Sequence, residues 1–101
     1  MTEIKNITVE ELKEKLKTEK IIIADVRREE DFAEKHLPGA VHLDQYNFND
    51  FVANTDKNAI IVICCYRGNR SRKMIPRLLH KGFKEVYNLT GGLTEWVDKS
   101  P

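Results

Sequence analysis

The sequence lacks any long hydrophobic segment. Its longest uninterrupted apolar run extends from Ala59 to Tyr66, far short of the roughly 18–20 residues that a membrane-spanning helix requires. The first residues are too polar for a secretory signal peptide. Gly/Ser-rich linkers, low-complexity tracts and internal repeats are also absent from the 101 residues. These absences predict one cytoplasmic domain over residues 1–101 that has no membrane partner.

Cysteine is scarce, because the chain contains only Cys64 and Cys65. Two adjacent cysteines cannot build a structural disulfide framework, and their presence fits a reducing compartment. A vicinal disulfide between them, or resolution of a Cys65 persulfide by Cys64, is a separate hypothesis about these two thiols.

Net charge is nearly absent as well. The 17 Lys and Arg residues against 16 Asp and Glu residues leave a formal charge of +1, which argues against a general nucleic-acid binder. The charges are nevertheless unevenly placed, since residues 57–84 contain 8 basic side chains and no acidic one. This distribution indicates a local cationic region and predicts no nucleic-acid partner.

Alternating strand and helix signals predict an α/β fold with a mostly parallel sheet. Strands are expected at residues 4–7, 21–25, 40–43, 60–63 and 85–89. Helices are expected at residues 8–18, where Thr8 and Glu11 form a capping box, at 28–35, near 48–52, at 71–81, and after Gly91 through Trp96. Gly82 ends the fourth helix. Pro76 predicts a kink or an irregular start in that helix, because proline removes a backbone hydrogen bond.

The segment after the expected strand at 60–63 carries the candidate chemistry. Ligands of open α/β sheets bind beyond the carboxyl ends of the strands, and a loop that curls into a helix start directs backbone N–H groups and positive potential toward one point. Such a setting favours a reactive thiolate. The candidate substrate-binding residues of this loop are Tyr66, Arg67, Gly68, Asn69, Arg70 and Ser71, followed by the cations Arg72 and Lys73.

Strand alternation assigns different roles to the two cysteines. Adjacent side chains of a strand point to opposite faces of a sheet, so only one of the two can face the loop. We expect Cys65, which begins the turn, to be the catalytic nucleophile and Cys64 to be a small buried hydrophobe. On the following helix, Arg77 and Lys81 are interpreted as solvated charges.

Four segments in this order resemble the rhodanese (sulfurtransferase) domain. They are Ile-Ala-Asp-Val-Arg at 23–27, His-Leu-Pro-Gly-Ala-Val-His-Leu at 36–43, the loop at 65–71, and the C-terminal part from Gly82-Phe83 through Trp96. The chain is most similar to the bacterial single-domain thiosulfate sulfurtransferases. The resemblance implies a single rhodanese-like domain, in which a central, mostly parallel five-stranded sheet is flanked by helices on both faces and the active cysteine starts a six-residue loop.

The resemblance also implies the chemistry. Cys65 would take a sulfane sulfur from thiosulfate or a related small anionic donor, and its persulfide would pass that sulfur to cyanide, a thiol or a protein acceptor. No metal or organic cofactor is implied. Asp25 and Arg27 are interpreted as a structural ion pair, while His36 and His42 are interpreted as structural residues and Trp96 as a core anchor.

Two alternatives belong to other classes. The residues from Cys64 to Arg70 have the Cys-x5-Arg spacing of cysteine-dependent phosphatases and arsenate reductases, with the loop beginning at Cys64. Ile63, however, precedes Cys64 where the common phosphatase pattern has histidine. The other alternative is a sulfur carrier or binding module without catalytic turnover, which would retain the same fold.

Overall fold

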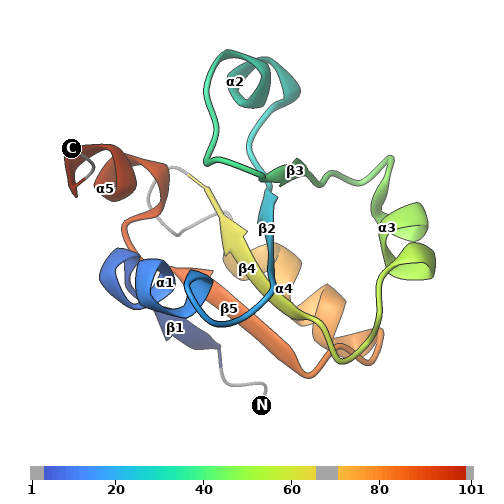
Figure 1. The fold of residues 1–101 in the computed structure, drawn as a ribbon. Helices are drawn as coiled ribbons and strands as arrows, with labels where there is room; N and C mark the ends of the chain where they lie inside the picture. The colour runs from blue at the N-terminus through green and yellow to red at the C-terminus, as the bar shows by residue number, and fades with distance from the viewer. Residues whose placement is uncertain (1–3, 66–70, 100–101) are drawn as a thin grey trace.

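The fold is described by a computed structural model that covers residues 4–65 and 71–99. Strands and helices alternate along the chain (Figure 1). The elements are β1 (Lys5–Ile7), α1 (Val9–Leu16), β2 (Ile21–Asp25), α2 (Glu29–Glu34), β3 (Val41–His42), α3 (Phe48–Asn54), β4 (Ile60–Cys64), α4 (Ser71–His80), β5 (Glu85–Leu89) and α5 (Gly92–Lys99). Each expected strand and helix is confirmed, with small differences at the ends.

The strands form one parallel sheet in the order β1-β5-β4-β2-β3. β4 lies at the centre, where its β-branched run is buried from both sides, as the apolar sequence predicted. Its last residue, Cys64, is paired in register with Asp25 of β2, and Ile63 is paired with Asn88 of β5. The ends of β2, β4 and β5 therefore meet at one edge of the sheet.

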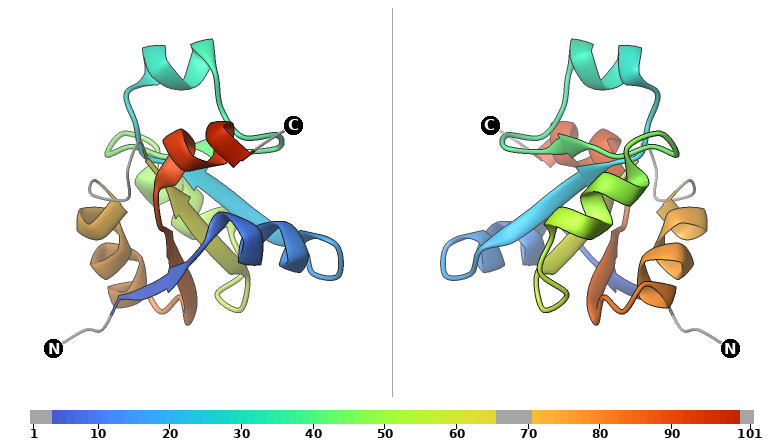
Figure 2. Two further views of the ribbon diagram at one scale, coloured as in Figure 1. Left: turned by 90° about the vertical axis from the view of Figure 1, so that its left-hand side faces the viewer. Right: turned by 90° about the vertical axis from the view of Figure 1, so that its right-hand side faces the viewer.

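Helices cover both faces of the sheet, and each face has its own core (Figure 2). On one face, Val9 and Leu12 of α1 and Leu93 of α5 pack against Val62. The other face is covered by α3 and α4, whose side chains pack on Ile61 and Ile63. Complete burial of one such aliphatic side chain contributes about 1.5–3 kcal/mol, so these two layers hold β4 firmly.

Local signals explain where the helices begin and end. Thr8 and Glu11 form the expected capping box, with the Glu11 N–H donating to Thr8 Oγ1 over 3.1 Å and the Thr8 N–H donating to Glu11 Oε1 over 2.9 Å. Gly82 follows α4 with φ of +99°, a conformation that glycine adopts without strain. Pro76 lies inside α4, which continues through it as one helix. In the described part of the chain, no helix is long and apolar enough to cross a membrane.

Candidate functional site

The two cysteines at the end of β4 lie on opposite faces of the sheet. Cys64 belongs to the core that α1 and α5 cover, together with Val62 and Leu93. The Cys65 sulfur lies toward the start of α4, 3.9 Å from Ser71 Oγ. Both cysteines are buried free thiols. The alternation predicted from the sequence is therefore present at this strand end.

Cys64 is held in its neutral form. Burial raises the pKa of its thiol to about 12, and the negative charge of nearby Asp25 acts in the same direction. Its Sγ donates a weak hydrogen bond to the Cys65 carbonyl oxygen over 3.6 Å. A thiol with these properties behaves as a small apolar side chain, which agrees with the bystander role expected from the sequence.

Backbone contacts fix the position of Cys65. Its carbonyl oxygen accepts a hydrogen bond from the Leu93 N–H over 2.8 Å, which attaches the start of α5 to the end of β4. The chain reaches this point through Gly91 and Gly92, with φ values of +78° and +54°. A Cβ atom at Gly91 would lie 2.6 Å from Cβ of Glu95. Glycine at 91 thus permits both the left-handed turn and the close packing of the Glu95 side chain against the start of α5.

A buried polar chain lies behind Cys65. Ser71 is completely buried at the first residue of α4, and its Oγ hydrogen bonds to Oδ1 of Asn88 on β5. Asn88 in turn donates from Nδ2 to Oδ1 of Asn6 on β1 over 3.0 Å. Because a serine hydroxyl has one proton, donating it to Asn88 leaves the Ser71 oxygen as an acceptor toward the Cys65 thiol. Asn88 and Asn6 therefore orient the group that contacts the candidate nucleophile.

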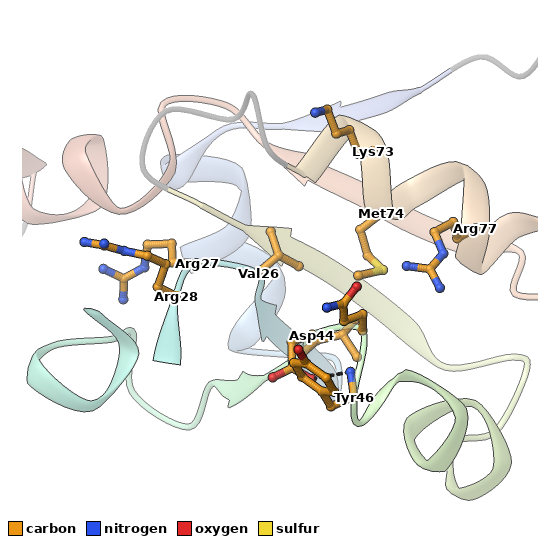
Figure 3. A pocket seen from close by; sticks show the side chains of 10 residues that line it. Val26, Arg27, Arg28, Asp44, Tyr46, Lys73, Met74 and Arg77 are labelled. Atoms are coloured by element: carbon orange, nitrogen blue, oxygen red, sulfur yellow. Dashed lines mark hydrogen bonds between the residues drawn. The ribbon is translucent and has the colours of Figure 1, made fainter. Parts of the chain in front are cut away.

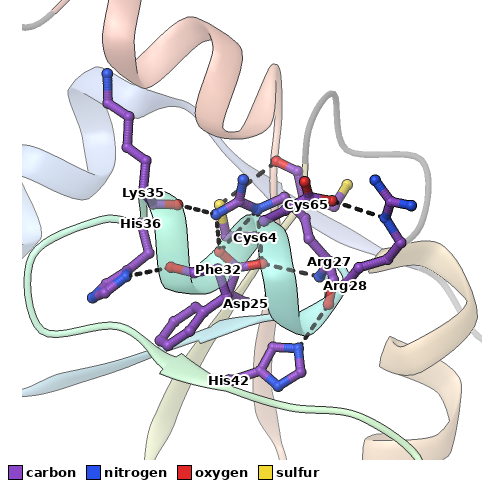
Figure 4. A network of polar contacts seen from close by, with 10 residues as sticks. Asp25, Arg27, Arg28, Phe32, Lys35, His36, His42, Cys64 and Cys65 are labelled. Atoms are coloured by element: carbon purple, nitrogen blue, oxygen red, sulfur yellow. Dashed lines mark hydrogen bonds and ion pairs between the residues drawn. The ribbon is translucent and has the colours of Figure 1, made fainter.

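A second buried network joins β2 to the segment after α2 (Figure 4). The Arg27 and Asp25 side chains are 2% and 0% exposed, and Arg27 Nη2 lies 2.7 Å from Asp25 Oδ2. Arg27 Nε donates to both carboxylate oxygens over 3.0 Å, and Nη2 also donates to the Lys35 carbonyl oxygen. This geometry agrees with the structural ion pair expected from the sequence. In the sheet register, Asp25 of this ion pair is the partner of Cys64 and not of Cys65.

The two histidines of the Pro-Gly region also make structural contacts. His42 Nε2 lies 2.7 Å from the Arg27 carbonyl oxygen, and His36 Nδ1 lies 2.8 Å from the Phe32 carbonyl oxygen. The His36 ring stacks on Phe32 with a centroid distance of 4.1 Å. Trp96 is partly buried against the core of α1 and α5, which fits the expected anchor.

The structure brings together Cys65 and Ser71 of the predicted site. The remaining predicted loop residues, Tyr66, Arg67, Gly68, Asn69 and Arg70, lie outside the described residues. Sequence reasoning missed Asn88 and Asn6, although a polar residue between Val86 and Leu89 in a buried strand is a signal that could have identified Asn88. Arg77 is exposed, as expected, and its guanidinium also lies 4.3 Å above the Phe48 ring.

Comparison with known proteins relates this architecture to one family. The sequence profile described as a rhodanese-like domain matches residues 8–99. The thiosulfate sulfurtransferase GlpE of Pseudomonas putida strain F1 is 38% identical over 96 residues, which cover 95% of this chain and 87% of that protein. The corresponding enzyme of Pseudomonas syringae is 35% identical over 101 residues, covering 100% of this chain and 94% of the relative.

Solved structures have the same architecture. The crystal structure of a rhodanese-like domain protein from Staphylococcus aureus superposes with a TM-score of 0.81 at 35% identity, covering 92% of this chain and 91% of the other. A human single-domain sulfurtransferase superposes with a TM-score of 0.84 at 20% identity, covering 98% and 100% of the two chains. At 20% identity, the similarity to the human protein shows a shared fold only.

Proposed function

The chain belongs to the rhodanese-like domain family, and we propose that it is a thiosulfate sulfurtransferase with Cys65 as its nucleophile. The observation that carries the proposal is the position of Cys65. It follows the central strand at the carboxyl edge of the sheet, and its sulfur contacts Ser71 at the first residue of α4. Active sites of open α/β sheets occupy this edge.

The reaction would take place in two displacements. The Cys65 thiolate attacks the outer sulfur of thiosulfate, the sulfur–sulfur bond of thiosulfate breaks, and sulfite leaves with the bonding electron pair. The enzyme then holds the sulfur as a Cys65 persulfide anion. Cyanide or a thiolate attacks the terminal sulfur, and Cys65 leaves as a thiolate. Charge balances in both steps, and neither step requires a metal or an organic cofactor.

The properties of Cys64 support the choice of Cys65, and not Cys64, as the nucleophile. Persulfide chemistry requires a thiolate, whereas the Cys64 thiol has a pKa raised to about 12 by burial. A phosphatase-like loop that begins at Cys64 would need that same buried sulfur as its nucleophile. We assign the loop residues 66–71 to binding of the donor and of the transferred sulfur. Two free thiols also support a reducing compartment such as the cytoplasm.

The test measures the covalent intermediate directly. The protein is incubated with excess thiosulfate, freed of small molecules and examined by intact and peptide mass spectrometry under non-reducing conditions. We expect a gain of one sulfur atom on Cys65 that cyanide removes as thiocyanate. Cys65→Ser should abolish the adduct, while the matched Cys64→Ser should retain it. An adduct on Cys64 alone would overturn the assignment, and efficient labelling with very slow turnover would instead indicate a sulfur carrier.

A further inference from the structure

A groove follows the edge of the sheet at β2, on the face that α3 covers. It consists of two adjoining cavities of about 600 Å³ and 410 Å³, whose linings share Ile22, Asn54 and Thr55. The first cavity lies between the start of β2 and the segment before β4, and the second lies between α3 and β3. We call the two cavities together the edge groove. Neither Cys65 nor Ser71 lines it, so the edge groove is separate from the candidate site.

The first half of β2 is an open edge of the sheet beside this groove. β3 pairs only with Ala24 and Asp25, so within the described part of the chain no strand lies beside residues 21–23 on that side (Figure 2). In a parallel sheet, the backbone groups of successive residues point to opposite sides of the strand. The Asp25 carbonyl oxygen accepts the Leu43 N–H over 2.8 Å on the β3 side. By this alternation, Ile21 directs its N–H and C=O to the open side, where they form a template for another strand.

The floor of the edge groove is apolar. Ile22 of β2 and Phe51 of α3 are partly buried against the core on this face. Val41 of β3 lines the same cavity and is 43% exposed, which makes it one of the few large hydrophobic side chains at the described surface. Side chains of a strand alternate between the two faces of a sheet. A strand added beside β2 would therefore place every second side chain on this apolar floor.

Negative charge predominates among the polar residues that line the edge groove. Glu19, Asp50 and Asp56 contribute carboxylates, and Lys20 contributes one positive charge. Glu19 pairs with Lys15 over 3.3 Å. Asp50 and Asp56 form no ion pair with any basic side chain of the described residues. Charge complementarity therefore favours a Lys or Arg side chain on a bound segment and opposes an acidic one.

The open backbone, the apolar floor and the acidic lining favour one kind of occupant. We propose that the edge groove binds an extended segment of a partner protein, which adds to the sheet as a strand beside β2 and carries apolar residues alternating with Lys or Arg. Hydrogen bonds to the Ile21 backbone supply affinity, while contacts with Val41 and Asp50 supply specificity. At about 3.3 Å per residue, three or four residues of the segment cover the open edge. Because Cys65 lies outside the groove, this inference does not depend on the proposed function.

The experiment selects a binding segment and then locates it on the protein. A random library of short peptides displayed on phage is selected on the immobilised full chain, with counter-selection on Val41→Lys, which places a positive charge on the apolar floor. The matched control is Leu16→Lys, since Leu16 is 39% exposed and lies on α1 outside the groove. Enriched peptides are synthesised with and without N-methylation of alternate backbone nitrogens. Binding is measured by fluorescence anisotropy, and amide hydrogen exchange of the complex is followed at Ile21.

We expect the enriched peptides to alternate apolar residues with Lys or Arg, and to slow exchange of the Ile21 amide by at least about tenfold. Val41→Lys should weaken binding at least about tenfold, Asp50→Asn about threefold to fivefold, and Leu16→Lys should leave it unchanged. N-methylation should abolish binding. The inference is overturned by a lack of enriched peptides, by enrichment of acidic ones, or by binding that leaves Ile21 exchange unaltered. A peptide that matches a segment of this chain, together with concentration-dependent dimerisation, would also overturn it, because the occupant would then be a second copy.

Discussion

At the scale of single residues, neighbouring positions in the sequence can have opposite chemistry. Cys64 and Cys65 are adjacent, yet one belongs to the core of α1 and α5 while the other contacts the start of α4. The pleat of β4 produces this separation, because it turns consecutive side chains to opposite faces. The difference between the two cysteines is thus a property of strand geometry.

The burial of Cys64 leads to a prediction about its reactivity. In a Cys65→Ser protein, Cys64 is the remaining thiol, and burial holds its pKa at about 12. Because alkylation requires the thiolate, iodoacetamide near pH 8 should modify Cys64 only when the protein unfolds. We expect labelling at least about 100-fold slower in buffer than in concentrated urea, measured by intact mass. Comparable rates in the two conditions would contradict the buried position.

Asn88 is expected to act on Cys65, the proposed nucleophile, through Ser71. Its Oδ1 receives the Ser71 hydroxyl proton, and its Nδ2 is held by Asn6. Asn88→Ala should destabilise the fold by about 1–3 kcal/mol, because it leaves a buried hydrogen-bonding group unsatisfied. It should also raise the rate of persulfide formation by thiosulfate, because the Ser71 hydroxyl no longer donates to Asn88 and its proton becomes available to stabilise the Cys65 thiolate.

A double-mutant cycle distinguishes this positioning role from a general loss of stability. Rates of persulfide formation are measured in single-turnover experiments for Asn88→Ala, Ser71→Ala and the double variant, at temperatures where all are folded. If Asn88 acts through Ser71, the two effects on the activation free energy should be non-additive by at least about 0.5 kcal/mol. Additive effects would remove Asn88 from the positioning chain.

At the scale of elements, α2 depends on polar contacts more than on apolar packing. None of its residues is fully buried, and in Figure 1 it projects beyond the end of β2. Arg27 connects it to the sheet, since this side chain bonds both to Asp25 at the end of β2 and to the Lys35 carbonyl oxygen just after α2. The stacking of His36 on Phe32 adds a second contact.

Removal of the Arg27 charge should therefore be costly. Arg27→Met leaves the Asp25 carboxylate buried without its counter-ion, and we expect a loss of about 3–5 kcal/mol in the free energy of unfolding, measured in urea. Adding Asp25→Asn should recover part of that loss, because the unpaired charge is removed. Arg28→Gln is the matched control, since the Arg28 side chain is 66% exposed and its ion pair contributes at most about 1 kcal/mol. Equal effects of the two arginine changes would contradict the role assigned to Arg27.

The elements were predictable from local sequence, whereas the side-chain networks were not. The β-branched runs of β2 and β4, the Thr8 capping box and Gly82 each act within a few residues, so they defined the secondary structure closely. The contact between Asn88 and Asn6 joins residues 82 positions apart and depends on the parallel register of β1 with β5. The cavity in Figure 3 likewise combines residues from the segment after β2, the segment after β3, and α4. Sequence patterns predict faces of elements, but not which distant polar side chains meet.

At the scale of the whole molecule, the net charge is near zero although one segment has an excess of positive charge. The acid-free segment 57–84 includes β4 and all of α4. Its described charges lie at both ends of α4, with Arg72 and Lys73 in the first turn and Lys81 and Lys84 between α4 and β5. Lys73 and Arg77 of this segment line the cavity in Figure 3. The chain therefore carries a local positive potential without being a basic protein overall.

The buried thiol also makes global stability depend on alkaline pH. Cys64 has a reference pKa of 9.0, which is raised to about 12 in the folded protein. The unfolded chain therefore loses this proton first, and stability should fall as the pH rises from about 9 toward 12. Between about pH 8 and pH 10, the wild-type protein should lose about 1 kcal/mol more than Cys64→Ala, as measured by urea unfolding at both pH values. Tyr87, whose pKa is raised to about 12 by its hydrogen bond to Glu85, contributes in both proteins and cancels in the difference. Parallel pH profiles for the two proteins would show that the Cys64 thiol ionises equally well in the folded and unfolded states.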